Sequence, residues 1–228
     1  KNQLKSVAIG GSAMREGDHE SSVAVGFWAS PYGNSTYCVF IGDSAGYRNV
    51  RGDIIRDKIT NSIAIGFNSR LNGDNEIQIG GNGQTLYAPT TVNIRSDGRD
   101  KTDIKPMQNG LEFVMKLKPV TGYYDRRDSY TDELFKDLPA DEREAKIREW
   151  WANPEKDGSH KEERLRHWFI AQDVAALESE YGQLPMVNLK NDTYTLEYES
   201  FIPVMVKAIQ ELSAQVEDLK SELKELKK

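Results

Sequence analysis

The sequence predicts a mixed fold in three successive parts: an all-β repeat region over residues 1–95, a charge-rich domain over residues 96–200 and a coiled-coil helix over residues 201–228. Three observations lead to this prediction. A short motif that ends in glycine recurs through the first part, most of the acidic charge lies after residue 95, and the last part has apolar residues at heptad spacing.

The repeat region is distinguished by its composition. Residues 1–95 hold 13 of the 18 glycines and a nearly balanced charge, with 9 Lys and Arg against 8 Asp and Glu. Residues 96–228 hold 21 Lys and Arg against 28 Asp and Glu. Two kinds of sequence therefore meet near residue 95.

The repeated motif is a short strand followed by a turn. It reads SVAIG at 6–10, SVAVG at 22–26, CVFIG at 38–42, SIAIG at 62–66 and EIQIG at 76–80. The first three copies are evenly spaced, the fourth follows after a longer step and the fifth after a shorter one. Apolar and small residues alternate within the motif, as they do in β-strands, and the final glycine permits a turn.

Strands of this size bury little by themselves, so they must stack on one another or be shared between chains. One possibility is a β-solenoid formed by a single chain. The small units and the irregular spacing favour the other possibility, in which the strands wrap around neighbouring chains. The motifs resemble those in the heads of trimeric bacterial adhesins and in phage tail fibres, and this resemblance implies a fibrous trimer.

From residue 201 the apolar residues alternate spacings of three and four, which predicts a coiled-coil seam. The seam consists of Ile202, Met205, Ile209, Leu212, Val216, Leu219, Leu223 and Leu226. The alternative is an amphipathic helix docked on its own domain, which normally has a wider apolar stripe. The mixture of Ile, Val and Leu in the seam does not distinguish a dimer from a trimer.

The composition excludes several classes of function. The net charge of −6 argues against a nucleic-acid surface, because phosphate binding requires a concentrated basic face. The apolar runs are short, so we expect no membrane insertion. The single cysteine, Cys38, fits assembly in a reducing cytosol. His19, His160 and His167 show no metal-binding spacing, so we expect no metal and no cofactor.

The segment IRSDGRDKTDI, residues 94–104, joins the first two parts and places Ser96 five residues before Lys101. A serine hydroxyl becomes a nucleophile when a base removes its proton. A lysine can be that base if burial or nearby positive charge lowers its pKa, and Arg95 and Arg99 could provide the charge.

The simpler interpretation is that Ser96 or Asp97 caps a turn, which a solvated run of charges follows. Residue chemistry alone favours it, because a serine and a lysine five residues apart are common. Five residues along an α-helix also rotate the side chain by roughly 140°. A reactive pair would therefore need a bend, with Gly98 as the hinge, or a lysine from another chain.

The rest of the chain resembles the C-terminal intramolecular chaperone domain of endosialidases, phage tailspikes and tail fibres. The motifs that carry the resemblance are RSDGRDKTDIKP (95–106), LKPVTGYY (117–124), WFIAQDV (168–174), LPMV (184–187) and LEYESFIPVMVKAIQEL (196–212). The resemblance implies an α+β chaperone domain over 96–200 that assembles a homotrimer, and a final helix that forms a parallel trimeric coiled coil.

The same resemblance implies self-proteolysis directly before the junction serine. The scissile bond would join Arg95 to Ser96, with Ser96 as the nucleophile and Lys101 as the base. Three further residues that match the motif, Asp97, Arg99 and Asp103, are expected to position this pair. A Ser/Lys pair is a known variant of the serine protease triad, and attack on the adjacent carbonyl group is intramolecular.

These expectations describe the C-terminal part of a phage tail-fibre or appendage precursor that assembles in the host cytoplasm and is located in the virion. Residues 1–95 would be the mature fibre tip, which binds a receptor or glycan on the host cell surface. The chaperone would be released on cleavage. The alternative is a non-enzymatic trimeric adhesin tip with an inert junction.

The segment 125–167 is longer and more charged than its counterpart in many relatives. Residues 141–151, DEREAKIREWW, predict a helix with an acidic first turn, and residues 153–158, NPEKDG, predict its end. Two interpretations stay open: the segment grips the β-fibre during folding, or it is a solvated surface excursion.

Overall fold

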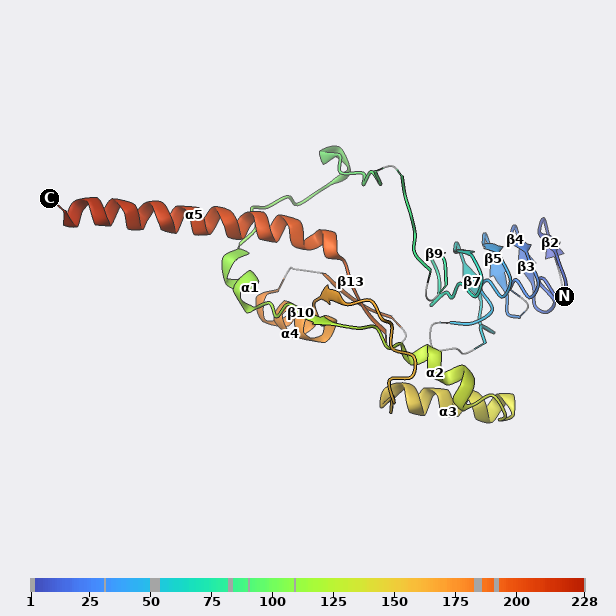
Figure 1. Ribbon diagram of the computed structural model, residues 1–228. Coiled ribbons are helices and arrows are strands. Elements are labelled where there is room, and N and C mark those ends of the chain that lie inside the picture. Colours follow the sequence, from blue (N-terminus) through green and yellow to red (C-terminus); the bar gives the residue numbers. More distant parts are fainter. Residues whose placement is uncertain are drawn as a thin grey trace. The chain divides into compact units, whose positions relative to one another are not determined.

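The computed structural model describes residues 3–30, 32–49, 54–81, 84–89, 91–108, 110–182, 186–190 and 193–227. The chain forms two compact units, one made of Lys1–Val92 and Asp125–Glu162 and the other of Asn93–Tyr124 and Glu163–Lys228. Figure 1 labels the elements of both units. The segment 125–162, which the sequence places inside the middle domain, groups with the repeat region.

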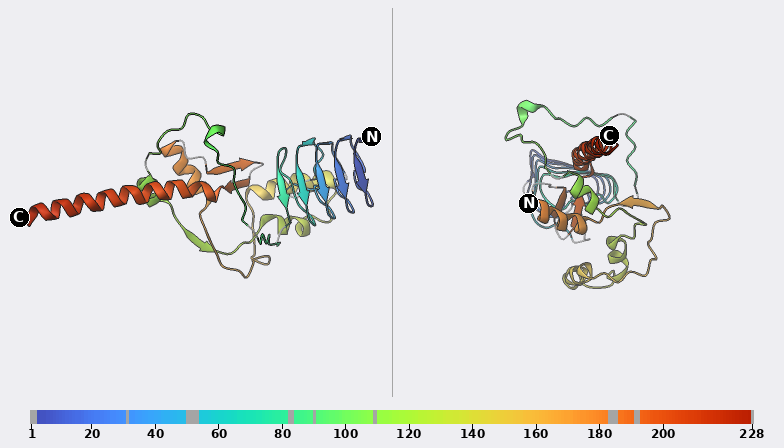
Figure 2. Two further views of the ribbon diagram at one scale, coloured as in Figure 1. Left: turned by 90° about the horizontal axis from the view of Figure 1, so that it is seen from above. Right: turned by 90° about the vertical axis from the view of Figure 1, so that its left-hand side faces the viewer.

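The repeat region forms two parallel sheets. The larger sheet contains, in spatial order, β2 (Val7–Ile9), β4 (Val23–Val25), β6 (Val39–Ile41), β8 (Ile63–Ile65) and β9 (Ile77–Ile79). The smaller sheet contains β1 (Gln3–Leu4), β3 (His19–Glu20), β5 (Ser35–Thr36) and β7 (Ile59–Thr60). Figure 2 shows the strands stacked one behind another, and this stack, residues 3–81, is called the roll below.

The strands of the roll find their partners within one chain, so the expectation that they wrap around neighbouring chains is wrong, and the single-chain solenoid is the arrangement found. Successive motifs pair in register, with Val23 between Val7 and Val39. Each of the first three steps between copies contains two short strands and two corners, which return the chain to its start one strand further along. The longer step is absorbed by a loop in which Arg48 and Ile54 form an antiparallel bridge.

The corners of the roll depend on left-handed backbone. Between the two strands of each coil, Lys5, Ser21, Tyr37 and Asn61 have φ of 55°, 48°, 58° and 52°. The opposite corner begins at the motif glycine, and Gly26 has φ of 137°. A Cβ on Gly26 would lie 2.5 Å from the carbonyl oxygen of Gly42, because successive corners stack directly on one another. This position therefore requires glycine.

In the three middle strands of the larger sheet, β4, β6 and β8, the central residue points inward and the flanking valines and isoleucines point outward. Ala24 and Ala64, the central residues of β4 and β8, are fully buried, and so is Phe40 in β6. The flanking residues point to the opposite side and form what is called the outer face: Val7, Ile9, Val23, Val25, Val39, Ile41, Ile63, Ile65, Ile77 and Ile79. Ile9 and Ile77 of this face are 58% and 70% exposed. A single chain therefore leaves the side chains of the outer face exposed or only partly buried.

The segment 125–162 contains α2 (Arg127–Leu134) and α3 (Ala140–Ala152). The helix predicted over 141–151 is confirmed, and it ends where the predicted stop begins. Three hydrophobic side chains of the segment, Tyr130, Ile147 and Trp151, are buried. The guanidinium of Arg127 lies 4.1 Å from the centre of the Trp151 ring and donates to the Trp151 carbonyl oxygen at 2.9 Å. The segment is thus a packed element of the first unit.

The second unit combines helices with two small antiparallel sheets. β10 (Val120–Gly122) pairs with β11 (Arg166–Trp168), and β12 (Val187–Lys190) pairs with β13 (Thr193–Leu196). The helices are α1 (Gly110–Lys116), α4 (Ala171–Tyr181) and α5 (Phe201–Leu226). Its core contains Phe113, Val174, Met186, Phe201 and Val204. The predicted mixture of helices and strands is confirmed, while Leu184 and Pro185 of the LPMV motif lie outside the described residues.

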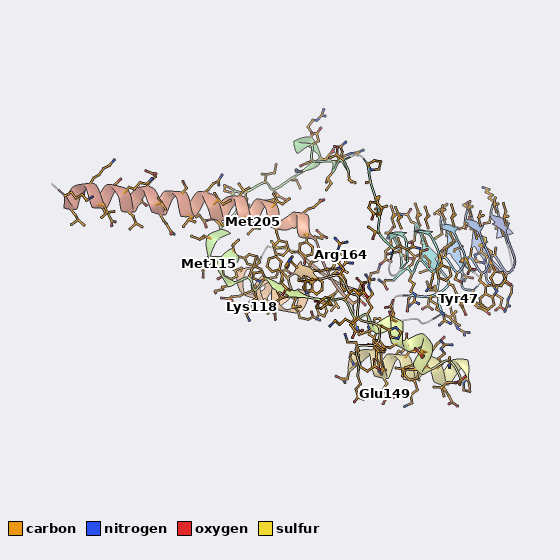
Figure 3. All side chains as sticks on the ribbon, in the orientation of Figure 1. Tyr47, Met115, Lys118, Glu149, Arg164 and Met205 are labelled. Carbon is orange, nitrogen blue, oxygen red and sulfur yellow. The ribbon has the colours of Figure 1, made fainter. Side chains whose placement is uncertain are left out.

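The long helix α5 has two apolar faces. Its first turns bury Phe201, Val204 and Ala208. Ala208 packs so closely on α1 that a Cβ on Gly110 would lie 2.7 Å from the Ala208 nitrogen. The eight heptad residues are 40% to 83% exposed, and Met205, labelled in Figure 3, is one of them. The helix therefore docks on its own domain and still leaves the heptad seam uncovered.

Candidate functional site

The junction segment forms a single 3-10 turn, η1 (Gly98–Asp100), which Asp97 caps. The Asp97 carboxylate accepts the N–H of Arg99 at 2.9 Å, and the Asp97 carbonyl accepts the N–H of Asp100 at 3.2 Å. Lys101 follows in extended conformation. Of the two capping residues that the sequence offers, Asp97 is therefore the one used.

The expected hinge at Gly98 is not what makes this bend. Gly98 does not have a positive φ, and a Cβ placed on it would meet nothing within 4 Å. The turn is held instead by the cap and by the N–H of Lys101, which donates to the Gly98 carbonyl oxygen at 3.3 Å. Glycine is therefore not required for the bend by the backbone or by the space around it.

The turn brings Ser96 and Lys101 of the same chain together. Lys101 Nζ lies 2.6 Å from Ser96 Oγ and 3.4 Å from the Ser96 carbonyl oxygen. Both residues are exposed to solvent. The predicted pair is thus within hydrogen-bonding distance, and it reaches this distance through a bend in one chain, which is one of the two routes that the spacing allowed.

Arg99 is paired with Asp97. Its Nε lies 3.1 Å and 3.2 Å from the two Asp97 carboxylate oxygens, and its Nη2 lies 2.6 Å from one of them. This hydrogen bonding lowers the pKa of Asp97 and raises the pKa of Arg99. The sequence suggests that the positive charge of Arg99 acts on Lys101. The guanidinium is instead paired with the Asp97 carboxylate, so Arg99 contacts the residue that caps the turn.

The other two predicted site residues stand apart from these pairs. The side chains of Arg95 and Asp103 are exposed, and Asp103 has φ of 54°. Among the contacts of the described residues, neither side chain joins the Ser96–Lys101 or the Asp97–Arg99 pair. The part of Arg95 that lies next to Ser96 is its carbonyl group, which forms the peptide bond to the Ser96 nitrogen.

The arrangement provides part of what a serine nucleophile needs. An amine within hydrogen-bonding distance can accept the hydroxyl proton only when the amine is uncharged, and a lysine in water is protonated at neutral pH. A single chain places the two groups correctly but leaves them in solvent. Removal of water from around Lys101 is the missing requirement.

A second contact in this unit has no signal in the local sequence. Glu211 of α5 accepts the N–H of Leu111, in the first turn of α1, at 2.6 Å. Lys207, one turn before Glu211, lies 3.4 Å from the same carboxylate. The two partners of the hydrogen bond are 100 residues apart, so only the folded chain reveals that α5 caps α1.

The described part of the chain offers no site for a metal ion, since no three or more of its His, Cys, Asp or Glu side chains are grouped to hold one. No helix within the described ranges is long and apolar enough to cross a membrane.

Comparison with known proteins identifies the middle of the chain. The search of curated proteins found no match. The family model Peptidase_S74, described as chaperone of endosialidase, matches residues 96–183, and its first matched residue is the serine that Lys101 contacts. The resemblance stated from the motifs is confirmed. Residues 96–183 are therefore a domain of the chaperone of endosialidase family.

Proposed function

We propose that this chain is the C-terminal part of a phage tail-fibre or appendage precursor, in which an intramolecular chaperone assembles the roll and then cuts itself off between Arg95 and Ser96. The observation that carries the proposal is the 2.6 Å contact between Lys101 Nζ and Ser96 Oγ, at the first residue of the family match.

The cleavage consumes one molecule of water. Uncharged Lys101 takes the proton of Ser96 Oγ, and the oxygen attacks the carbonyl carbon of Arg95. The bond from that carbon to the Ser96 nitrogen breaks, the proton passes to the nitrogen, and an ester to Ser96 Oγ remains. Water then hydrolyses the ester, which leaves a carboxylate on Arg95 and a free hydroxyl on Ser96. Because the hydroxyl belongs to the residue next to the carbonyl group, proximity supplies much of the rate.

Cutting depends on assembly in this proposal. Lys101 is exposed in the single chain, so the surroundings that keep it uncharged come from association with further copies. A precursor that has not assembled would keep Lys101 in solvent and stay whole. Cleavage would then follow folding in time.

The proposed assembly is a homotrimer. Two uncovered apolar surfaces support self-association: the outer face of the roll and the heptad seam of α5. Copies that associate in parallel could bury both surfaces. The number three rests on the resemblance to chaperone domains and to adhesin heads.

The strand pairing of the roll determines which step of assembly the chaperone would promote. Because the strands of the roll pair within one chain, what remains for the chaperone is to bring three outer faces together. A coiled coil that joins the chains raises the local concentration of those faces. After cleavage the roll would persist through slow unfolding, separated from the element that assembled it.

The mature roll would lie at the surface of the virion and bind a receptor or glycan of the host cell. The second candidate function is a non-enzymatic trimeric adhesin tip with an inert junction. The exposure of both Ser96 and Lys101 favours this candidate, because a solvated lysine is a poor base.

A denaturing gel of the purified trimer separates the two candidates. The proposal predicts two fragments from the wild type, one spanning 1–95 and the other 96–228, and an intact chain from Ser96→Ala or Lys101→Ala. If the wild-type chain stays whole after trimerisation has been verified, the proposed protease activity is excluded and the proposed chaperone function is not. Cutting that persists in Ser96→Ala would show that another group is the nucleophile.

A further inference from the structure

The last full coil of the roll has a buried arginine at a place where the earlier coils have uncharged residues. Met14, Ser30, Gly46 and Arg70 are separated by the same steps as the first four copies of the repeated motif. The backbone agrees with this equivalence, since the nitrogens of Met14, Ser30 and Gly46 donate to the carbonyls of Ala29, Ala45 and Ser69. A buried guanidinium is costly unless a carboxylate is near it.

Asp128 of α2 supplies a carboxylate. Its Oδ2 lies 3.4 Å from Arg70 Nη1, and the two side chains are only 10% and 7% exposed. The neighbouring Thr131 is fully buried, and its hydroxyl donates to the Asp128 carbonyl oxygen at 3.1 Å. A second and more exposed pair joins Arg56 Nε of the roll to Glu144 Oε1 of α3 at 3.5 Å. Both pairs run from the roll to the segment 125–162.

The two charges of the buried pair lie on opposite sides of the proposed cut. Arg70 precedes the bond between Arg95 and Ser96 in the chain, and Asp128 follows it. Cleavage would therefore turn this ion pair into a contact between two fragments without changing its atoms. Salt screens a buried pair much less than a pair in solvent.

We infer that the segment 125–162 is a clamp with which the chaperone holds the last coil of the roll, and that the clamp keeps the two fragments associated after the backbone is cut. The inference rests on the proposed function for the roles of chaperone and client. Release of the chaperone is then a step of its own, which requires the Arg70–Asp128 pair to separate.

The test uses the full-length Ser96→Ala protein with a recognition sequence for a site-specific endoprotease placed in the exposed stretch 84–89. The added protease makes the cut, so the result does not depend on whether Ser96 is a nucleophile. Size-exclusion chromatography then follows the fragments at about 0.15 M and about 1 M salt. We expect them to co-elute at both concentrations, and Asp128→Asn to raise the fraction of free fragment at least severalfold.

The matched control is Glu149→Gln on α3, a residue labelled in Figure 3. It also removes a carboxylate from the segment, but Glu149 is exposed and pairs with Lys146 of the same helix at 2.8 Å. We expect this variant to behave like its parent. Hydrogen exchange on the undigested proteins gives a second readout, with faster exchange over 125–162 in Asp128→Asn and none of that change in Glu149→Gln.

Two results would overturn the clamp. One is separation of the parent fragments as soon as the protease has cut. The other is an Asp128→Asn protein whose fragments stay together as firmly as those of the parent and whose segment 125–162 exchanges no faster. Whether wild-type protein cuts itself is read separately on the denaturing gel, so failure of the clamp and failure of the proposed protease are distinguishable.

Discussion

Lys101 contacts Ser96 of its own chain, with Nζ 2.6 Å from the serine hydroxyl oxygen and 3.4 Å from the serine carbonyl oxygen. One 3-10 turn produces this contact, so a second copy is not needed to bring the amine to the hydroxyl. What another copy can add is cover from solvent. The contact between Ser96 and Lys101 therefore comes from one chain, whereas their cover from solvent would come from another. The two contributions can be tested separately.

The contact within one chain predicts that cleavage occurs in cis. When Ser96→Ala and Lys101→Ala chains are mixed in one trimer, we expect every chain to remain whole, because neither contains both groups. Co-expression with two different tags, followed by a denaturing gel and mass spectrometry, checks this. Restored cutting of the Lys101→Ala chain would show that the lysine of one chain serves the serine of another.

The cap of the turn predicts a graded effect at Asp97. Asp97→Ala removes both the bond to the Arg99 N–H and the ion pair, so fewer molecules hold the turn and cutting should slow severalfold. Asp97→Asn keeps an oxygen for the N–H and should cut nearly as fast as the wild type. The rate of fragment formation on a gel measures both. Equal rates for Asp97→Ala and the wild type would contradict a role for the cap.

The stacked glycine corners predict a contrast between two substitutions. Gly26→Ala should destabilise the roll by about 1–3 kcal/mol, because residue 26 has φ of 137° and the new Cβ would lie 2.5 Å from the Gly42 carbonyl oxygen. Gly98→Ala should leave stability and cutting unchanged, since nothing lies within 4 Å of its Cβ position. Thermal unfolding followed by circular dichroism measures the first effect, and the gel measures the second.

The link between α5 and α1 predicts a dependence on pH. The N–H of Leu111 lowers the pKa of Glu211, with a further contribution from Lys207. A lowered folded-state pKa means that the ionised carboxylate stabilises the fold above the unfolded pKa of about 4.3, and that this contribution is lost as the pH falls through the folded pKa. Glu211→Gln should therefore lower the Tm at pH 7, and its difference from the wild type should shrink in acid.

The control for this prediction is Glu217→Gln. Glu217 also pairs with a lysine of α5, Lys220, at 2.7 Å, but its side chain is exposed. Its Tm should follow that of the wild type at every pH. A Tm difference for Glu211→Gln that stays constant from neutral to acid pH would show that ionisation of Glu211 does not contribute.

The outer face of the roll predicts an effect on assembly. Ile41→Asp places a charge among valine and isoleucine side chains, and the loss of apolar burial alone amounts to about 2 kcal/mol for each chain. Sedimentation of the protein should then show less trimer, while the parallel strand pairing within each roll persists. Glu20→Gln, on the smaller sheet, serves as the control. Unchanged sedimentation of Ile41→Asp would remove this face from the proposed interface.

The sequence predicts the strands of the roll well but not how they are arranged. The alternation in SVAVG (22–26) shows that Val23 and Val25 share one side, and Ala24 takes the other. It does not show which side is the interior, and the side of Ala24 is the one inside. Stacking within one chain also depends on corners such as Ser21 and Asn61, whose left-handed backbone has no strong sequence signal.

At the site, the sequence predicts that Ser96 and Lys101 form a pair, and it leaves open whether Ser96 or Asp97 caps the turn. It does not predict the turn that joins them, because capping by Asp97 and a hinge at Gly98 are equally compatible with the spacing. The sequence also does not predict contacts between residues that are far apart along the chain. Arg70 and Asp128 are 58 residues apart, and each looks like an ordinary surface charge until the fold buries both.

The position of the outer face early in the chain has a consequence for synthesis. The ribosome makes the roll first and the heptad helix last, so the isoleucines and valines emerge before the helix that follows them exists. During that interval each nascent roll exposes an apolar surface to other chains that are being translated from the same mRNA. The time needed to translate residues 82–226 therefore sets how long the roll must avoid the wrong partner, and a premature stop codon would make that exposure permanent.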